Sequence, residues 1–313
     1  MTDPQQGDAP DWEAQEQERQ KLALKNVAGW AGGFIRHRWT ATGHEIRLGV
    51  RNVLDRDEPA VGTIPAVVSM TSYGKRLRRT AYLALESIAR GSVRPSRLIL
   101  WVDEPEVLED PPQTLRRLMA RGVEVLPCEN YGPHKKYYPY VASREHHDLP
   151  LVTADDDVIY PYRWLEQIWG VHTQHPGDVV AMRAHRVRLQ GKILTPYLTW
   201  HPVRSTQASH RHFATGVSGV LHPPAMLEAL RESGTTFTER CPKADDIWLH
   251  WHSLRTGTRV RQVHNRPRDF REIERPWQTG LFESNGYGGA NDAQINALYT
   301  AEDIAVMVDD IPR

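Results

Sequence analysis

The sequence predicts an α/β fold in which a mostly parallel sheet is covered by helices on both faces. From about residue 62 onward, short apolar runs alternate with segments that have the spacing of amphipathic helices. The fourth of these runs leads directly into three aspartates. Because such sheets bind ligands at the carboxyl ends of their strands, this order of elements also predicts where a site lies.

Four strands and four helices account for residues 64–172. Val, Ile and Leu dominate the strands, and Gly91, Pro111, Pro112 and Gly122 mark where the first two helices begin or end. Later in the chain, the sequence predicts a helix after Pro242, a strand over 258–263 and a short last helix from Asn291. The predicted strands are 64–70, 96–102, 123–127 and 149–154, and the predicted helices are 77–90, 111–121, 135–147 and 160–172.

Residues 1–60 differ in composition from the rest and predict an N-terminal helical or irregular extension to a domain over 61–313. Residues 3–26 are rich in Gln, Glu and Asp, as in a loose helix or a disordered tail. Residues 34–56 combine arginines with apolar and aromatic side chains. That mixture suits either a segment packed on the domain or peripheral contact with an anionic membrane surface.

Composition excludes several classes of protein. The 39 Lys and Arg balance the 39 Asp and Glu, so the basic surplus of a non-specific nucleic-acid binder is missing. No run of about 18 apolar residues predicts a membrane-spanning helix, and the acidic start is unlike a secretory signal. The two cysteines, Cys128 and Cys241, do not form a disulfide framework. We therefore expect a cytoplasmic protein, with peripheral contact at the inner face of the membrane as an option.

Asp155, Asp156 and Asp157 are the most informative feature of the sequence. Three adjacent carboxylates repel one another, and a divalent cation such as Mg²⁺ or Mn²⁺ would offset that repulsion. In an extended segment, Asp155 and Asp157 point to the same side. His264, after the strand 258–263, is a candidate third metal ligand. The alternative is a solvated turn or a helix N-cap.

A second acidic pair, Asp245 and Asp246, opens the helix that follows Pro242. A carboxylate there can serve as a general base for a substrate hydroxyl. The alternative is simple capping, because acidic residues in a first helical turn interact favourably with the helix dipole.

Basic residues near the strand ends are candidates for contact with a diphosphate. For each of them a solvated basic face is the alternative. Gly216 and Gly219 allow close backbone approach to a ligand, or serve turns. The basic residues are Lys75, Arg76, Arg78 and Arg79 after the first strand, and His134, Lys135 and Lys136 before the fourth. No phosphate-binding loop and no dinucleotide-binding glycine motif is present in the sequence.

Four segments, taken in order, resemble nucleotide-sugar glycosyltransferases of the GT-A fold. Residues 67–105 resemble the opening strand, helix and second strand of that family, and residues 131–141 with 151–168 resemble the segment that carries its Asp-x-Asp motif. Residues 216–227 (GVSGVLHPPAML) and 241–249 (CPKADDIWL) resemble the glycine segment on the acceptor side and the downstream acidic motif. The likeness is greatest to the bacterial family-two-like transferases that build surface polysaccharides.

The resemblance implies a donor and roles for the matched residues. Asp155 and Asp157 would hold Mn²⁺ or Mg²⁺, Asp155 and Asp156 would contact the donor's ribose or diphosphate, and Asp245 or Asp246 would deprotonate a glycan or lipid-linked acceptor. The donor would most often be a UDP-sugar. The residues expected around the base and diphosphate are Thr71, Tyr73, Arg76, Asp103, Lys135 and Lys136.

The sequence also departs from the family. It reads Ala-Asp-Asp before Ile247, where Glu-Asp is commoner, so both the identity of the base and the stereochemical outcome stay open. The Gln-x-x-Arg-Trp motif of processive synthases is missing, which favours single additions. Inverting, non-processive transfer is the expectation.

Two other classes are alternatives. A phosphatase of the haloacid-dehalogenase type also has Asp-x-Asp after a strand, but on its first strand and with Thr where this chain has Ile159. A non-catalytic carbohydrate-binding protein would use some of the ten Trp and eleven Tyr to stack on sugar rings.

Overall fold

The structure is a computed structural model that describes residues 43–273 and 290–310. The chain divides into two units, Met1–Arg47 and Leu48–Arg313, and the site described below lies in the second. Residues 34–42 and most of the predicted extension lie outside the described residues. Residues 48–60 belong to the second unit. The boundary predicted after residue 60 stays a prediction.

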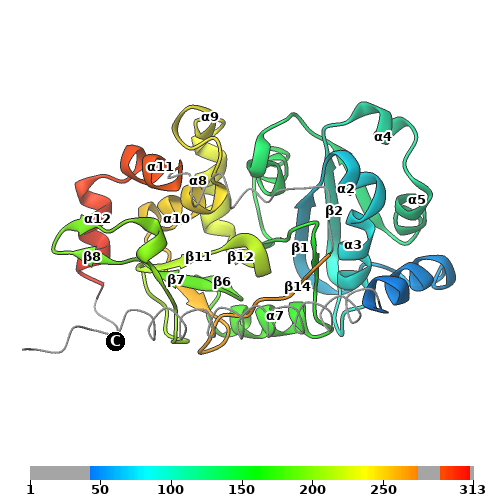
Figure 1. Cartoon of the computed structure of the whole chain (residues 1–313), viewed down its shortest axis with the longest axis horizontal. Coiled ribbons are helices and arrows are strands. Elements are labelled where there is room, and N and C mark those ends of the chain that lie inside the picture. Colours follow the sequence, from blue (N-terminus) through cyan, green and yellow to red (C-terminus); the bar gives the residue numbers. More distant parts are fainter. Residues whose placement is uncertain (1–42, 274–289, 311–313) are drawn as a thin grey trace, which may run out of the picture. The chain divides into compact units, whose positions relative to one another are not determined.

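The largest sheet of the described residues confirms the predicted α/β class. Its seven strands lie in the order β13–β6–β12–β4–β1–β2–β3, and Figure 1 labels β6, β12, β1 and β2 of this sheet. Neighbours pair in parallel except β12, which is antiparallel to both β4 and β6. The strands are β1 (Ile64–Thr71), β2 (Pro95–Val102), β3 (Val123–Pro127), β4 (Leu151–Thr153), β6 (Val179–Ala181), β12 (Val220–His222) and β13 (Val260–Gln262).

Smaller sheets and short helices complete the unit. The smaller sheets contain β5 (Val158–Ile159) with β14 (Arg271–Glu272), β8 (Leu189–Gln190) with β9 (Ile193–Leu194), and β7 (Ala184–Arg186) with β10 (His201–Pro202) and β11 (His212–Ala214). The helices are residues 43–54, α2 (Gly74–Arg79), α3 (Ala81–Ala89), α4 (Pro105–Glu109), α5 (Gln113–Ala120), η1 (Gly132–Lys136), α6 (Tyr138–Ala142), α7 (Trp164–Gln174), η2 (Tyr197–Thr199), η3 (Gly216–Ser218), α8 (Pro224–Ser233), α9 (Phe237–Arg240), α10 (Asp245–Arg255), α11 (Ala290–Leu298) and α12 (Ala301–Val308).

Helices cover both faces of the large sheet, as the continuous apolar runs predicted. Alternate residues of a strand point to opposite faces, so Val67 and Val68 of β1 enter different cores. Val68 packs in the core with α3, α5 and α7, whereas Val67 packs in the core with α6, α8 and α10. Each fully buried Val or Leu contributes about 1.5–3 kcal/mol.

Three predicted helices are shorter than expected or divided, two of them next to a proline. The predicted helix 135–147 is present only as η1 and α6, because Pro139 lacks the backbone N–H that a helix interior needs. Helix α7 begins at Trp164, after Pro161, and not at residue 160. The predicted helix 77–90 is divided at Thr80 into α2 and α3. The short strand β12 runs against its neighbours, which the sequence pattern did not reveal.

A buried ion pair ties Asn52 and Arg121, the residue after α5, to α3. Glu86 of α3 is fully buried, and its Oε1 accepts hydrogen bonds from Arg121 Nη1 at 2.7 Å and from Asn52 Nδ2 at 2.8 Å. Arg121 also donates to the carbonyl oxygen of Glu58 at 2.8 Å. The segment that precedes β1 is therefore tied to the core by charge-assisted hydrogen bonds.

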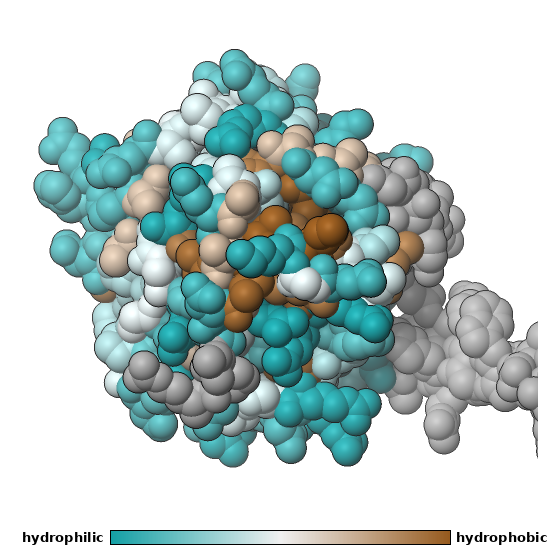
Figure 2. All heavy atoms as spheres, turned by 90° about the vertical axis from the view of Figure 1, so that its left-hand side faces the viewer, coloured by the Kyte–Doolittle hydropathy of each residue, from teal (hydrophilic) through white to brown (hydrophobic). Residues whose placement is uncertain are grey.

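One side of the unit carries apolar surface. Figure 2 views the side of α12 and β8, and apolar side chains gather near the centre of this view within a polar rim. Large exposed apolar side chains in these elements and their neighbours include Ile193, Leu198 and Val306. Apolar residues of the described chain are therefore not confined to the core.

Candidate functional site

The aspartate triplet lies where the predicted parallel strands end. Asp155, Asp156 and Asp157 connect β4 with β5, and β4 lies beside β1 in the sheet. Ser72, directly after β1, donates a hydrogen bond from its hydroxyl to Asp156 Oδ2 at 2.5 Å. The ends of β1 and β4 are thus joined by side chains at one edge of the sheet.

Cations of the chain itself partner all three carboxylates. Lys136 Nζ lies 2.7 Å from Asp155 Oδ1. Arg76 Nη1 lies 2.8 Å from Asp156 Oδ1 and 3.3 Å from Asp157 Oδ2. From the sequence we expected a divalent ion to offset the repulsion among the three carboxylates. In this structure Arg76 and Lys136 offset it.

Lys136 connects the triplet to the second acidic pair. Its Nζ also lies 3.3 Å from Asp245 Oδ2, and its backbone carbonyl accepts a hydrogen bond from Ser69 of β1 at 2.7 Å. Burial acts to lower the pKa of Lys136, but attraction to Asp155, Asp245 and Asp246 outweighs it and holds the pKa well above its usual range. Lys136 is therefore a permanent cation between the two acidic groups.

Asp245 and Asp246 form the first turn of α10, and a role for either as a general base stays a prediction. They interact with the helix dipole, as capping residues do, and they also face the cluster around Lys136. Asp246 Oδ1 accepts a hydrogen bond from the backbone N–H of Gly216 at 3.0 Å. Burial, followed by repulsion from Asp245, raises the pKa of Asp246 to about 7, against the opposing effects of Lys136 and Gly216. A carboxylate with that pKa is suited to act as a general base at neutral pH.

A side chain larger than that of Gly216 would crowd the Asp246 carboxylate. A Cβ atom there would lie 3.0 Å from Asp246 Oδ1 and 3.4 Å from Lys136 Nζ. We expect Gly216→Ala to displace the Asp246 carboxylate and to lower the activity of the site about tenfold or more, while the protein stays folded. Gly170→Ala is the matched control, because a Cβ at Gly170 meets nothing within 4 Å. Equal activity in the two variants would contradict a close fit at Gly216.

The predicted donor-side residues gather at the ends of β1 and β2. The guanidinium carbon of Arg76 lies 4.5 Å from the centre of the Tyr73 ring, and Lys135 Nζ lies 5.7 Å from it. Lys135 Nζ also lies 2.6 Å from Asp103 Oδ1. Thr71 is close by in sequence, but its hydroxyl donates to the carbonyl of Trp101 at 3.0 Å. The contacts therefore link all of these residues except Thr71 around one partly exposed tyrosine ring.

The structure pairs His264 with α7 and not with the aspartates 155–157. Its Nε2 lies 3.3 Å from Oε1 of Gln167 in α7. Within residues 43–273 and 290–310, no three His, Cys, Asp or Glu side chains come together as a set of metal ligands. A role for His264 as a third ligand stays a prediction.

Two of the other basic residues have structural partners. Arg78 is paired with Glu104 at 3.2 Å. His134 is fully buried, its ring nitrogens lie 2.9 Å from Tyr137 Oη and 2.8 Å from the carbonyl of Cys241, and burial lowers its pKa to about 4. Because both ring nitrogens of this buried side chain already have protein partners, His134 has no nitrogen left for a phosphate in this structure.

Ser72 and Tyr160 contact the triplet but were not predicted as site residues. The hydroxyl of Tyr160 accepts a hydrogen bond from the backbone N–H of Asp155 at 2.7 Å. Both residues are close in sequence to predicted features, because Ser72 comes just after the first strand and Tyr160 comes three residues after the triplet. Their position near strand ends was the available signal.

Comparison with known proteins yields likenesses of fold. No family model matches the chain, and no curated protein matches it either. Among solved structures it is similar to S. aureus TarS 1–349, with a TM-score of 0.43 and 12% identity over 65% of this chain and 59% of that chain. It is also similar to the mannosyltransferase PcManGT from Pyrobaculum calidifontis in complex with GDP-Man and Mn²⁺, with a TM-score of 0.44 and 14% identity over 80% of this chain and 69% of that chain.

A third similar structure is CMP:2-keto-3-deoxy-manno-octonic acid synthetase in complex with CTP. The TM-score is 0.39 and the identity 11%, over 64% of this chain and 89% of that chain. The chain spans 59% of the TarS chain it matches. Each of these likenesses concerns the fold and leaves the activity to be argued from the site.

Proposed function

We propose that the protein is a glycosyltransferase that moves a sugar from a nucleotide-diphosphate donor to a hydroxyl of a glycan or lipid-linked acceptor. One observation carries this proposal. At a single edge of the sheet, the aspartates 155–157 and the cations Arg76 and Lys136 adjoin Asp246, a carboxylate whose pKa of about 7 suits a base. Donor-binding charge and an acceptor base are the two parts that such a transfer needs.

The donor would lie across the ends of β1, β2 and β4. Arg76, Lys135 and Lys136 carry positive charge that can stabilise the developing charge on the leaving diphosphate. The Tyr73 ring, 42% exposed, offers a surface on which the nucleotide base can stack. Thr71 at the end of β1 and Asp103 after β2 would contact the same nucleotide. Asp156 would bind the ribose or the diphosphate, and a uridine nucleotide is the donor we favour from the family resemblance.

The carboxylates of the triplet fit a divalent ion only in part. Carboxylate oxygens are the ligands that Mg²⁺ and Mn²⁺ prefer, and Mg²⁺ commonly takes one or two carboxylates together with substrate phosphates. Asp155 and Asp157 would supply those carboxylates, with His264 proposed as a third ligand. When bound, the ion would add positive charge beside the diphosphate. Arg76 and Lys136 would then have to give up part of their contact with the triplet.

Asp246 is the carboxylate that we assign as base. Asp245 Oδ2 is within 3.3 Å of Lys136 Nζ, whereas Asp246 Oδ1 is held by a backbone N–H. Asp246 would accept the proton of the acceptor hydroxyl as its oxygen attacks the anomeric carbon. The diphosphate would leave from the opposite side, so the configuration would be inverted. One sugar would be added per encounter.

The activity should depend on pH with a single acid limb. A raised pKa means that Asp246 still holds a proton at weakly acidic pH, so the ionised base is lost as pH falls through about 7. We expect kcat/KM to fall about tenfold per pH unit below that value. The same shift means that the contribution of Asp246 to folding stability is lost as pH rises through about 7. Initial rates between pH 5 and 9 test this, and a flat profile would remove Asp246 as the base.

Asp157→Ala should abolish metal-dependent nucleotide binding. The test is a thermal-shift screen of uridine, guanosine, cytidine and adenosine diphosphates with and without Mn²⁺. In the unmodified protein we expect one nucleotide to stabilise the fold more strongly when Mn²⁺ is present. In Asp157→Ala the Mn²⁺-dependent part of the shift should vanish. In Asp110→Ala, whose carboxylate follows α4 and is 84% exposed, it should persist. A full shift in Asp157→Ala would exclude this residue as a ligand.

Neither alternative class gains support from the site. In the haloacid-dehalogenase pattern the motif follows the first strand, whereas here it follows β4, and β1, β2 and β3 come earlier in the chain. Among the large aromatic side chains, Trp164, Trp248 and Tyr160 are buried in the cores and are not available to stack on sugars.

Peripheral membrane contact through residues 34–56 stays part of the proposal. Residues 43–54 are helical, and Val50, Val53 and Leu54 are among their exposed side chains. Apolar side chains beside arginines are typical of segments that lie on anionic bilayers. In the part of the chain that the structure describes, no helix has the length and apolar character to cross a membrane.

A further inference from the structure

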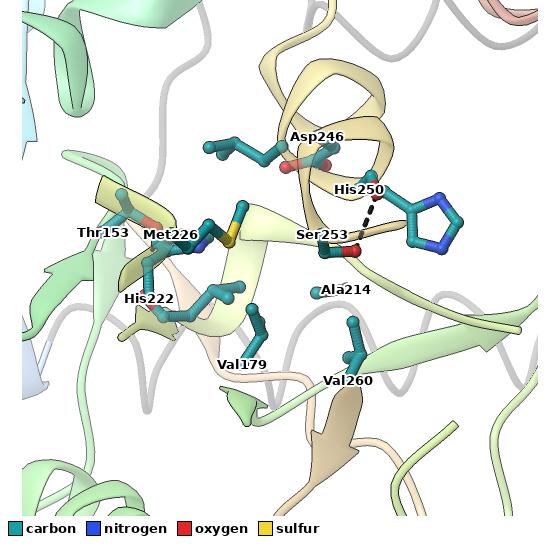
Figure 3. A pocket seen from close by; sticks show the side chains of 11 residues that line it. Thr153, Val179, Ala214, His222, Met226, Asp246, His250, Ser253 and Val260 are labelled. Atoms are coloured by element: carbon teal, nitrogen blue, oxygen red, sulfur yellow. Dashed lines mark hydrogen bonds between the residues drawn. The ribbon is translucent and has the colours of Figure 1, made fainter. Parts of the chain in front are cut away.

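A small cavity adjoins the base on the side of α10 (Figure 3). It lies between β12, α8 and α10, and most of its wall is apolar, with side chains such as Met226, Leu249 and Val260. Asp246 and His222 both contribute to this wall. The space is about that of one water molecule.

His222 is the unusual residue in the wall. It belongs to β12 and is 2% exposed, and neither Nδ1 nor Nε2 has a hydrogen-bond partner among the described protein groups. Burial, together with the positive charge of Lys136, lowers the pKa of His222 to about 3, so the ring is neutral. A neutral imidazole has one donor and one acceptor nitrogen. Buried groups of this kind are nearly always satisfied by protein or by ordered water.

The remaining polar groups of the wall supply further partners for a water molecule. The Ser253 hydroxyl donates to the carbonyl of His250 at 2.7 Å, which leaves its oxygen free to accept. The Thr153 hydroxyl donates to the carbonyl of Val220 at 3.3 Å and can accept in the same way. With His222 and the Asp246 carboxylate, the cavity offers the two to four polar partners that a buried water needs.

We propose that a water molecule in this cavity connects the imidazole of His222 to the carboxylate of Asp246, and that His222 is thereby a positioning residue for the base. His222 would donate to the water, and the water would donate to Asp246. This bond and the Gly216 N–H would hold the carboxylate from two directions. The inference rests on the proposed function, because it assigns Asp246 as the base.

The expected effect has a defined direction. A hydrogen bond donated to a carboxylate favours its ionised form, so loss of the His222 contact should raise the pKa of Asp246. The other titratable groups whose charge acts on Asp246 or is acted on by it stay unchanged in the experiment. They are Asp245 at the start of α10, Cys241 directly after α9, Lys136 of η1, Asp155 after β4 and Tyr197 of η2.

His222→Phe is the direct test, because it keeps a ring of similar size and removes both nitrogens. We expect kcat to fall about 10- to 100-fold and the acid limb of kcat/KM to move to higher pH. His222→Gln, which keeps a donor, should recover much of the loss. Unchanged kcat and an unchanged acid limb in His222→Phe would overturn the proposal.

His252→Phe is the matched control. His252 is also buried, and its Nε2 also lacks a hydrogen-bond partner among the described groups, but it does not line the cavity. The control should lose stability without moving the acid limb. An equal movement in both histidine variants would show a general packing effect and would refute the role of His222.

Two measurements separate this inference from the proposed function. Side-chain ¹³C NMR follows the titration of Asp246 without any turnover, and it should show a higher pKa in His222→Phe than in the unmodified protein. A crystal structure should show the water between His222 and Asp246. If the protein transfers no sugar but these two results hold, the positioning role stands and the proposed function fails. If the enzyme transfers sugar but shows neither the bridging water nor the raised Asp246 pKa, the positioning role of His222 fails and the proposed function stands.

Discussion

Asp246→Asn should lower the turnover number of sugar transfer by about 10²–10⁴-fold, the usual contribution of a general base. The amide keeps the size of the side chain and can still accept from Gly216, which donates to Asp246 Oδ1 at 3.0 Å. It cannot take up the proton of the acceptor hydroxyl. The loss should therefore appear in kcat, while the affinity for the nucleotide donor changes little.

Asp245→Asn is the matched control for this prediction. The two residues are adjacent on α10, but the Asp245 carboxylate is the one within 3.3 Å of Lys136 Nζ. We expect a smaller loss of turnover in Asp245→Asn, because its effect on the base is through repulsion. The measurement is single-turnover transfer at saturating donor, together with nucleotide affinity by calorimetry. A larger loss in Asp245→Asn would transfer the role of base to Asp245.

Glu86→Ala should reduce the free energy of unfolding by about 3–5 kcal/mol, the cost of leaving one partner of a buried ion pair without the other. The side chains of Glu86 and Arg121 are 0% and 1% exposed, and they meet at 2.7 Å. Removing Glu86 would leave the Arg121 guanidinium uncompensated and would free Asn52 of residues 43–54. Urea unfolding at neutral pH gives the value directly.

Glu58→Ala provides the comparison for Glu86. Glu58 pairs with Arg51 and Arg94 at 2.7 and 3.0 Å, but its side chain is 55% exposed. Water screens such pairs, and we expect a loss of about 1 kcal/mol or less. Similar losses in the two variants would mean that burial does not control the strength of the Glu86 pair.

Much of the fold was predictable because the sequence pattern is local. The predicted strands 64–70, 96–102 and 123–127 match β1, β2 and β3 to within a residue or so, since buried parallel strands are continuous apolar runs. The short strand β4 and the aspartates after it were also placed. The strand β12 and its antiparallel direction were not predicted, because Val220–His222 has only two apolar residues and so short a run carries no sign of how it pairs.

The candidate site was predictable by residue type but not by pairing. The sequence indicated acidic and basic groups at strand ends, yet it could not show that Arg76 and Lys136 reach Asp155, Asp156 and Asp157. Those contacts join residues about 20 to 80 positions apart, which only the tertiary fold brings together. His222 escaped notice for the same reason, since nothing in its local sequence reports burial or an unsatisfied ring.

The ion pairs of Arg76 and Lys136 also bear on how the chain folds in a cell. Because the carboxylates after β4 find their counter-charges within the polypeptide, this loop can reach its native conformation before any inorganic ion or nucleotide arrives. We therefore expect this loop to fold without an added metal ion. On the proposed function, an ion or nucleotide that binds here would have to displace Arg76 and Lys136 from the carboxylates, so its affinity would depend on how easily these two side chains move.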